Sequence, residues 1–71
     1  MKKLSFREIE LLKYTARGFT AKEIAKLTGL EPRTIETYII NARKKLHAKN
    51  IAHAIYIALR ANIINEISVD Q

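Results

Sequence analysis

Polar side chains recur at helical spacing in one segment of the sequence. They are Arg33, Glu36, Thr37, Asn41 and Lys44, and at about 100° per residue they fall on one side of a helix. The set offers a guanidinium, a carboxylate, a hydroxyl, an amide and an ammonium group, which donate and accept hydrogen bonds and carry charge. These residue types predict recognition of a polar, charged partner.

The opposite side of the same segment is apolar, and one further apolar residue, Ile40, lies among the polar side chains. Pro32 suits the first position of a helix because its missing N–H would have no partner there. No helix breaker follows before His47. We therefore expect a helix from Pro32 to Leu46 whose buried side is formed by Ile35, Tyr38, Ile39, Ala42 and Leu46.

A shorter helix precedes this one. Thr20 and Glu23 have the spacing of a capping box, in which each side chain bonds to the backbone N–H of the other residue. Gly29 supplies a left-handed residue that ends the helix about two turns later. A short helix, a turn with Gly and a longer helix with a polar outer face form the helix-turn-helix pattern, in which the second helix fits the major groove of DNA. Similar corners occur in other all-α proteins, so the pattern alone does not decide the function.

Two more helices complete the expected fold. Ser5 and Glu8 form a second capping box, and the first helix is expected from Leu4 to Arg17. The last helix is expected from Asn50, a favourable cap, to Ala61. The helix starts lie close together, and the chain has only two Gly and one Pro. The predicted fold class is all-α, a four-helix helix-turn-helix domain.

The last helix carries a wide apolar arc. Its Ile, Ala and Leu residues cover roughly 200°, whereas one contact with a core needs a stripe of about 100°. A small domain does not easily bury so wide an arc, so we expect part of it to contact a second copy. The alternative is a helix that lies deep in the core. The residues expected at a homodimer interface are Ile51, Ala54, Ile55, Ala58 and Leu59.

The composition fits one small domain with a polyanionic partner. We expect 71 residues to form a domain over 1–64 and a short tail over 65–71, in which Ile67 and Val69 could pack back. The net charge is +6, with nine basic and three acidic residues between Lys13 and Lys49. The absence of cysteine excludes disulfides and thiolate sites. No signal peptide or membrane-spanning run is recognisable, so we expect a cytoplasmic protein without membrane contact.

Several runs of the sequence match one known family in order and spacing. They are the opening from Leu4 to Leu12, the run from Gly18 to Ala25, and the pairs Thr34-Ile35 and Lys45-Leu46. Over about Leu4 to Ile64 the sequence resembles the LuxR-type (GerE-like) helix-turn-helix domain of bacterial transcription regulators. The resemblance implies a DNA-binding domain that dimerises through its last helix, usually behind a sensory or receiver domain. The chain shows no such domain, and an excised effector domain and a free-standing regulator both remain open.

The resemblance also implies roles for individual residues. Positions that face DNA bases in the family are held here by Glu36, Thr37 and Ile40, and positions near the bases or phosphates by Arg33, Asn41 and Lys44. Positions that contact the DNA backbone are held by Thr20, Lys22, Thr34 and Tyr38. For Tyr38 the alternative is a ring that completes the edge of the core, and for Thr34 a side chain that only caps or packs.

Some residues depart from the family pattern. Glu36 stands where Lys is common; a carboxylate is repelled by phosphate, yet it can accept from the N4 amine of cytosine. Ile40 can contact a thymine methyl group or have no role. Thr28 stands where a core Leu is usual, and Ile51 where a basic residue is usual.

Other functions are compatible with the same helices. A promoter-reading domain of a sigma factor ends similarly, although it normally lacks the last helix. A protein-interaction module that binds another regulator or RNA polymerase, with little affinity for DNA, would explain Glu36. An enzyme is not expected, because the chain has no catalytic motif. His47 and His53 lack a clear third ligand, so neither a metal nor a cofactor is expected.

Overall fold

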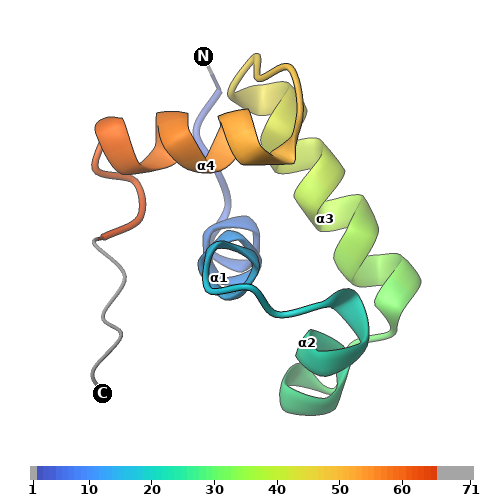
Figure 1. Ribbon diagram of the computed structural model, residues 1–71. Helices are drawn as coiled ribbons and strands as arrows, with labels where there is room; N and C mark the ends of the chain where they lie inside the picture. The colour runs from blue at the N-terminus through green and yellow to red at the C-terminus, as the bar shows by residue number, and fades with distance from the viewer. Residues whose placement is uncertain (1, 66–71) are drawn as a thin grey trace.

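The computed structural model describes residues 2–65, which form four α-helices and no strand. Helix α1 spans Phe6–Ala16, α2 spans Ala21–Thr28, α3 spans Pro32–Lys45 and α4 spans Ile51–Arg60 (Figure 1). The predicted all-α fold is confirmed. The expected packing of Ile67 and Val69 concerns residues outside those described.

The helix starts are fixed by the expected caps. In the capping box of α1, the N–H of Ser5 donates to Oε1 of Glu8 at 2.8 Å, and the N–H of Glu8 donates to the Ser5 hydroxyl at 3.1 Å. The Thr20 and Glu23 pair repeats both bonds at the start of α2, at 2.8 and 3.2 Å. Each box satisfies two backbone groups that a helix terminus leaves unpaired, so these boundaries are set by local sequence.

Each helix is followed by a residue with positive φ. Gly18 and Gly29 have φ of 91° and 79°, and Asn62 has φ of 62°. These three residues were predicted at such positions, because Gly and Asn adopt the left-handed conformation at low cost. His47 was not predicted there, yet its φ is 57°. Its N–H donates to the carbonyl of Lys44 at 3.1 Å and the next N–H, of Ala48, donates to Arg43 at 3.1 Å, which is a Schellman motif built on a histidine.

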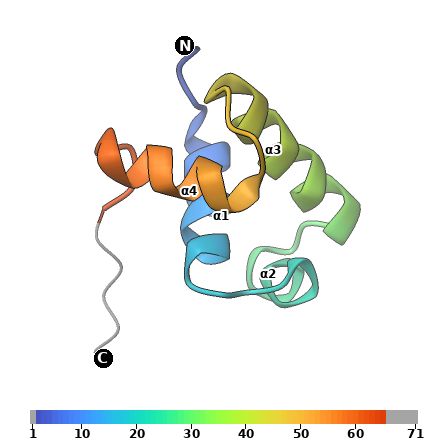
Figure 2. The ribbon, with the colours of Figure 1, turned by 45° about the horizontal axis from the view of Figure 1, so that its top comes forward.

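Two apolar clusters hold the helices together, and α1 contributes to both (Figure 2). Leu11 faces a cluster with Ile24 of α2 and Ile35 of α3. Leu12, the next residue, faces a second cluster that joins α1 to the end of α3 and to α4. Adjacent side chains on a helix point about 100° apart, so α1 can separate two layers. Helix α3 packs against all three other helices and is therefore held rigidly.

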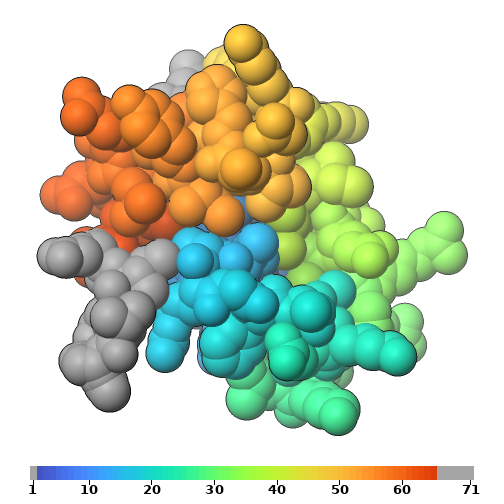
Figure 3. All heavy atoms as spheres, viewed as in Figure 1, coloured from blue at the N-terminus to red at the C-terminus, as the bar shows by residue number. Residues whose placement is uncertain are grey.

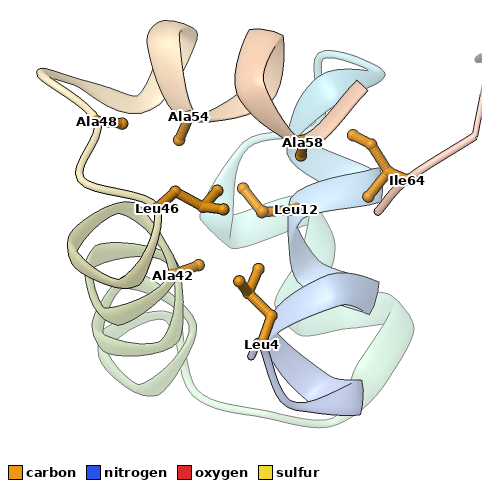
Figure 4. Packing of buried hydrophobic residues seen from close by; sticks show 8 residues of the cluster. All are labelled: Leu4, Leu12, Ala42, Leu46, Ala48, Ala54, Ala58 and Ile64. Carbon is orange, nitrogen blue, oxygen red and sulfur yellow. The ribbon is translucent and has the colours of Figure 1, made fainter. Parts of the chain in front are cut away.

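Helix α4 packs through its alanines, which corrects part of the predicted dimer interface. Ala54 and Ala58 are fully buried, and their side chains point into the cluster that contains Leu12 and Leu46 (Figure 4). Small side chains let α4 approach closely, so these two residues have no surface for a second copy. The exposed side of α4 instead carries Tyr56 and Leu59, which are 59% and 38% exposed.

Within residues 2–65, we find no helix that has both the length and the apolar character needed to cross a membrane.

Candidate nucleic-acid interface

The outer face of α3 is exposed along its whole length. The core holds Ile35 and Ala42 with no exposed surface, which fixes the rotation of the helix about its axis. Almost all the residues expected to contact DNA from this helix then lie on the surface: Arg33, Thr34, Glu36, Thr37, Ile40, Asn41 and Lys44. The exposed fraction of Ile40 is 44%, which leaves an apolar contact area among polar groups.

Tyr38 differs from the rest of the set. It is half-buried and packs against the cluster of Leu11, Ile24 and Ile35. Its ring therefore completes the edge of the core, which was the alternative role considered for it.

The hydroxyl of Thr37 is oriented by its own helix. Its Oγ1 donates to the carbonyl oxygen of Arg33 at 3.0 Å. The hydroxyl proton is used in this bond, and the oxygen lone pairs remain available to accept. In this rotamer Thr37 suits a donor such as the exocyclic amine of a base, and it would have to rotate to donate to a phosphate oxygen.

The start of α2 adds a second group of exposed side chains. Thr20 and Lys22 are both exposed. The Thr20 oxygen accepts from the backbone N–H of Glu23, so its hydroxyl proton remains free to donate to a phosphate. In Figure 3 the atoms of α2 and of the first part of α3 adjoin at one corner of the molecule, and α4 covers the opposite corner. The candidate nucleic-acid surface and the exposed side of α4 are therefore separate.

The corner between α2 and α3 is closed by Thr28. Its hydroxyl donates to the carbonyl of Ile24 at 2.8 Å, and its oxygen accepts from the N–H of Leu30 at 3.2 Å. Two hydrogen bonds thus replace the apolar contact expected of a Leu. The preceding residue, Leu27, points outward and is 57% exposed. The hydroxyl fixes the turn that sets the angle of α3 relative to α2.

A buried ion pair, which was not predicted, anchors the far end of α3. Nζ of Lys45 lies 2.8 Å from Oε1 of Glu8, and the Glu8 side chain is only 5% exposed. Burial alone would raise the pKa of Glu8. The hydrogen bond from Lys45, the bonds from Ser5 and the Lys45 charge together outweigh it and hold the pKa below its ordinary value of 4.5. Glu8 is therefore ionised at neutral pH and ties α3 to α1.

An open groove of about 650 Å³ lies beside the second half of α3. It is lined by Lys2, Glu8, Asn41, Lys44, Lys45 and His47. Asn41 and Lys44 belong to the expected DNA-binding set, whereas Lys2 and His47 do not. The basic character of the N-terminal residues was visible in the sequence, but their position beside α3 depends on the tertiary fold.

The two histidines have separate surroundings. The backbone N–H of Lys49 donates to Nδ1 of His53 at 3.0 Å, and the N–H of His53 donates to the Asn50 side chain at 2.8 Å. His53 is thus part of the cap of α4. Within the part of the chain that the structure describes, no three His, Asp or Glu residues lie together as a metal site would require.

Comparison with known proteins gives the family of this surface. The family model described as bacterial regulatory proteins, luxR family, matches residues 2–58. The chain belongs to the LuxR family of bacterial regulatory proteins. Its predicted identification is confirmed, and the surface of α2 and α3 is that of a LuxR-family helix-turn-helix DNA-binding domain.

Individual relatives of this LuxR-family domain are regulators of transcription. The transcriptional activator protein BjaR1 of Bradyrhizobium diazoefficiens is 36% identical over 63 residues, which are 89% of this chain and 26% of that protein. The transcriptional regulatory protein FixJ of the same bacterium is 33% identical over 63 residues, which are 89% of this chain and 31% of FixJ. The quorum sensing-dependent transcriptional regulator VjbR of Brucella ovis is 37% identical over 62 residues, which are 87% of this chain and 24% of VjbR. The chain therefore spans between about a quarter and a third of these relatives.

Proposed function

We propose that this domain binds double-stranded DNA sequence-specifically, with α3 in the major groove, and so regulates transcription in the bacterial cytoplasm. The observation that carries the proposal is the exposed polar face of α3, held in one orientation by Ile35 and Ala42 on its buried side. A rigid helix with such a face presents fixed donors and acceptors, which base recognition requires.

The contacts fall into two groups. Glu36, Thr37 and Ile40 lie in the middle of the exposed face and are assigned to base edges. The carboxylate accepts from cytosine N4, the hydroxyl oxygen accepts from an amine, and the isoleucine suits a thymine methyl group. The residues assigned to phosphates or adjacent bases are Thr20, Lys22, Arg33, Thr34, Asn41 and Lys44. Phosphate contacts fix the register of α3 but carry no sequence information themselves.

We further propose that the domain acts as a homodimer through the exposed side of α4. Ile51 and Ile55 are half-buried and Leu59 is exposed, so these predicted residues can contact a partner. Tyr56, which was not predicted, adds an aromatic side chain to the same side. Because this side lies away from α2, two copies related by a two-fold axis can each leave α3 open to DNA. Their recognition helices would read half-sites about 34 Å apart.

A protein-interaction function is the second candidate, and Glu36 favours it. A carboxylate on the outer face of α3 opposes the phosphate charge, so a relative that had lost DNA affinity could keep the fold and bind another regulator or RNA polymerase. The net charge of +6 opposes this candidate, because it suits a polyanion.

Selection from a random DNA pool tests the proposal. The purified domain is mixed with random duplexes at low and moderate salt, and the retained DNA is sequenced. We expect enrichment of a dyad-symmetric motif and retention that weakens steeply with salt, because phosphate contacts release counterions. Retention without a motif would contradict sequence-specific binding. No retention at low salt would overturn DNA binding and support the protein-interaction candidate.

A further inference from the structure

We infer that the groove lined by Lys2, Asn41, Lys44 and His47 holds a backbone phosphate of the bound duplex, outside the base pairs read by α3. The inference rests on the proposed DNA-binding function and adds the N-terminal segment to the interface. It makes Lys2 a DNA contact and assigns a role to His47.

The charges that line the groove favour an anion. One of its cations, Lys45, is neutralised by Glu8 at 2.8 Å. The other ion pair found within residues 2–65 joins Arg7 to Glu10, so Lys2 and Lys44 keep their full charge there. Asn41 adds an amide that can donate. Two ammonium groups and an amide around one open space provide the donors that a phosphate oxygen accepts.

The groove lies at the end of α3 that is opposite to α2. Figures 1 and 2 both show the N-terminal segment beside the end of α3, whereas α2 lies beside its start. With 14 residues, α3 is about 21 Å long, whereas the major groove is about 12 Å wide. The two ends of the helix therefore reach the two sugar-phosphate backbones that border the groove. Thr20 and Lys22 meet one backbone, and the groove of Lys2 and Lys44 meets the other.

The negative end of the α3 dipole would ordinarily repel an anion at this position. Here the last carbonyl groups of the helix already accept hydrogen bonds. The carbonyl of Arg43 accepts from Ala48, and that of Lys44 accepts from His47. The guanidinium of Arg43 also donates to the carbonyl of Ala48 at 3.0 Å, which places a further positive charge beside the turn. These bonds reduce the repulsion that a phosphate would meet.

His47 is held at the groove by an unfavourable backbone conformation. Its φ of 57° is one that Gly adopts at lower cost. A glycine there would end the helix equally well but would place no side chain in the groove. The imidazole lines the groove and can donate a hydrogen bond from a ring N–H. The strained residue therefore lies where its side chain has a ligand to meet.

The neighbouring lysines provide a matched test. Lys2 lines the groove, whereas Lys3 is exposed and lies outside its lining. Binding of a short random-sequence duplex is measured by fluorescence anisotropy over a range of salt for the wild-type chain, Lys2→Ala and Lys3→Ala. For Lys2→Ala we expect the salt slope to fall by about 0.9 for each groove occupied, so that a fourfold change in salt separates it from the wild type by a further factor of about three. Lys3→Ala should keep the wild-type slope.

A double variant examines whether one phosphate is shared. If Lys2 and Lys44 hold the same phosphate, the loss of affinity in the double Ala variant is smaller than the sum of the two single losses. Equal slopes for Lys2→Ala and Lys3→Ala, with wild-type binding intact, would overturn the groove and leave the proposed function standing. Strictly additive losses would overturn the shared site. A wild-type chain that does not bind the duplex at low salt would instead overturn the proposed function itself.

Discussion

Glu8 and Lys45 are joined across the domain, with Nζ of Lys45 2.8 Å from Oε1 of Glu8. The same oxygen accepts from the backbone N–H of Ser5 at 2.8 Å. One carboxylate therefore starts α1 and fixes the end of α3, which is the helix assigned to DNA. Since the side chain is only 5% exposed, its charge depends on these partners.

Replacing this carboxylate should destabilise the domain. Glu8→Gln keeps the size and an acceptor oxygen but removes the charge, so we expect a loss of about 1 to 3 kcal/mol in the free energy of unfolding, measured by urea denaturation. Glu10→Gln is the matched control, because Glu10 pairs with Arg7 at 2.9 Å while both side chains are about one third exposed. That exposed pair should cost no more than about 0.5 kcal/mol. Equal losses in the two variants would contradict a special role for Glu8.

The Glu8 pair should also make stability depend on pH. The pKa of Glu8 is lower in the folded domain than its ordinary value of 4.5, so the folded state binds this proton less readily than the unfolded state. Its stabilising contribution is complete above the unfolded pKa and is lost as pH falls through the folded pKa. We expect the stability difference between the wild type and Glu8→Gln to narrow between about pH 6 and pH 3. A constant difference across that range would show that the charge of Glu8 is not responsible.

Substitution of His47 by Gly should stabilise the domain. The left-handed conformation costs a non-glycine residue about 1 to 2 kcal/mol, and the greater freedom of Gly in the unfolded chain offsets part of the gain. We expect His47→Gly to gain about 0.5 to 1 kcal/mol in thermal or urea unfolding. Asn62→Gly is the control, since Asn tolerates its φ of 62° better and should gain less. A loss of stability in His47→Gly would mean that the imidazole itself supports the fold.

The features predicted correctly from the sequence are those determined over a few residues. The capping bonds between Ser5 and Glu8 join residues three apart, and a capping box can be recognised without the fold. Lys45 lies 37 residues from Glu8, so the second role of this carboxylate depends on how α1 and α3 pack. Nothing in the local sequence distinguishes Glu8, which carries a tertiary contact, from Glu23, which caps α2 at an exposed position.

The candidate site shows the same limit. The apolar spacing of Ile35 and Ala42 gave the rotation of α3 and hence its exposed face. On α4 the apolar arc was too wide to show which part is buried, and Ala54 and Ala58 were placed on the wrong side. The closing turn at His47 could not be predicted from residue type, because His is not a usual left-handed residue. Its position became recognisable only from the short spacing to the next cap, Asn50.

The exposed side of α4 predicts a dimer that one substitution should weaken. Leu59→Glu places a charge on this side, so we expect the dimer dissociation constant to rise at least about tenfold, measured by analytical ultracentrifugation. Leu27→Glu is the matched control, because Leu27 is also an exposed leucine but lies on α2. It should leave the dimer unchanged. A wild-type chain that stays monomeric at high concentration, or equal weakening by both variants, would contradict dimerisation through α4.

Glu36 should determine the base at one position of each half-site. A carboxylate accepts from cytosine N4, whereas a glutamine amide both donates and accepts and so pairs with adenine N6 and N7. In a repeat of the random-pool selection, Glu36→Gln should therefore exchange cytosine for adenine at a single position and leave the others unchanged. Its affinity for all duplexes should also rise, because a charge that opposes the phosphates is removed. Glu31→Gln removes an exposed carboxylate at the N-cap of α3, where it makes no capping bond, so it should raise affinity without altering the motif. If Glu36→Gln behaves in the same way as Glu31→Gln, Glu36 contacts no base, and the specificity of α3 rests on Thr37, Ile40 and their neighbours.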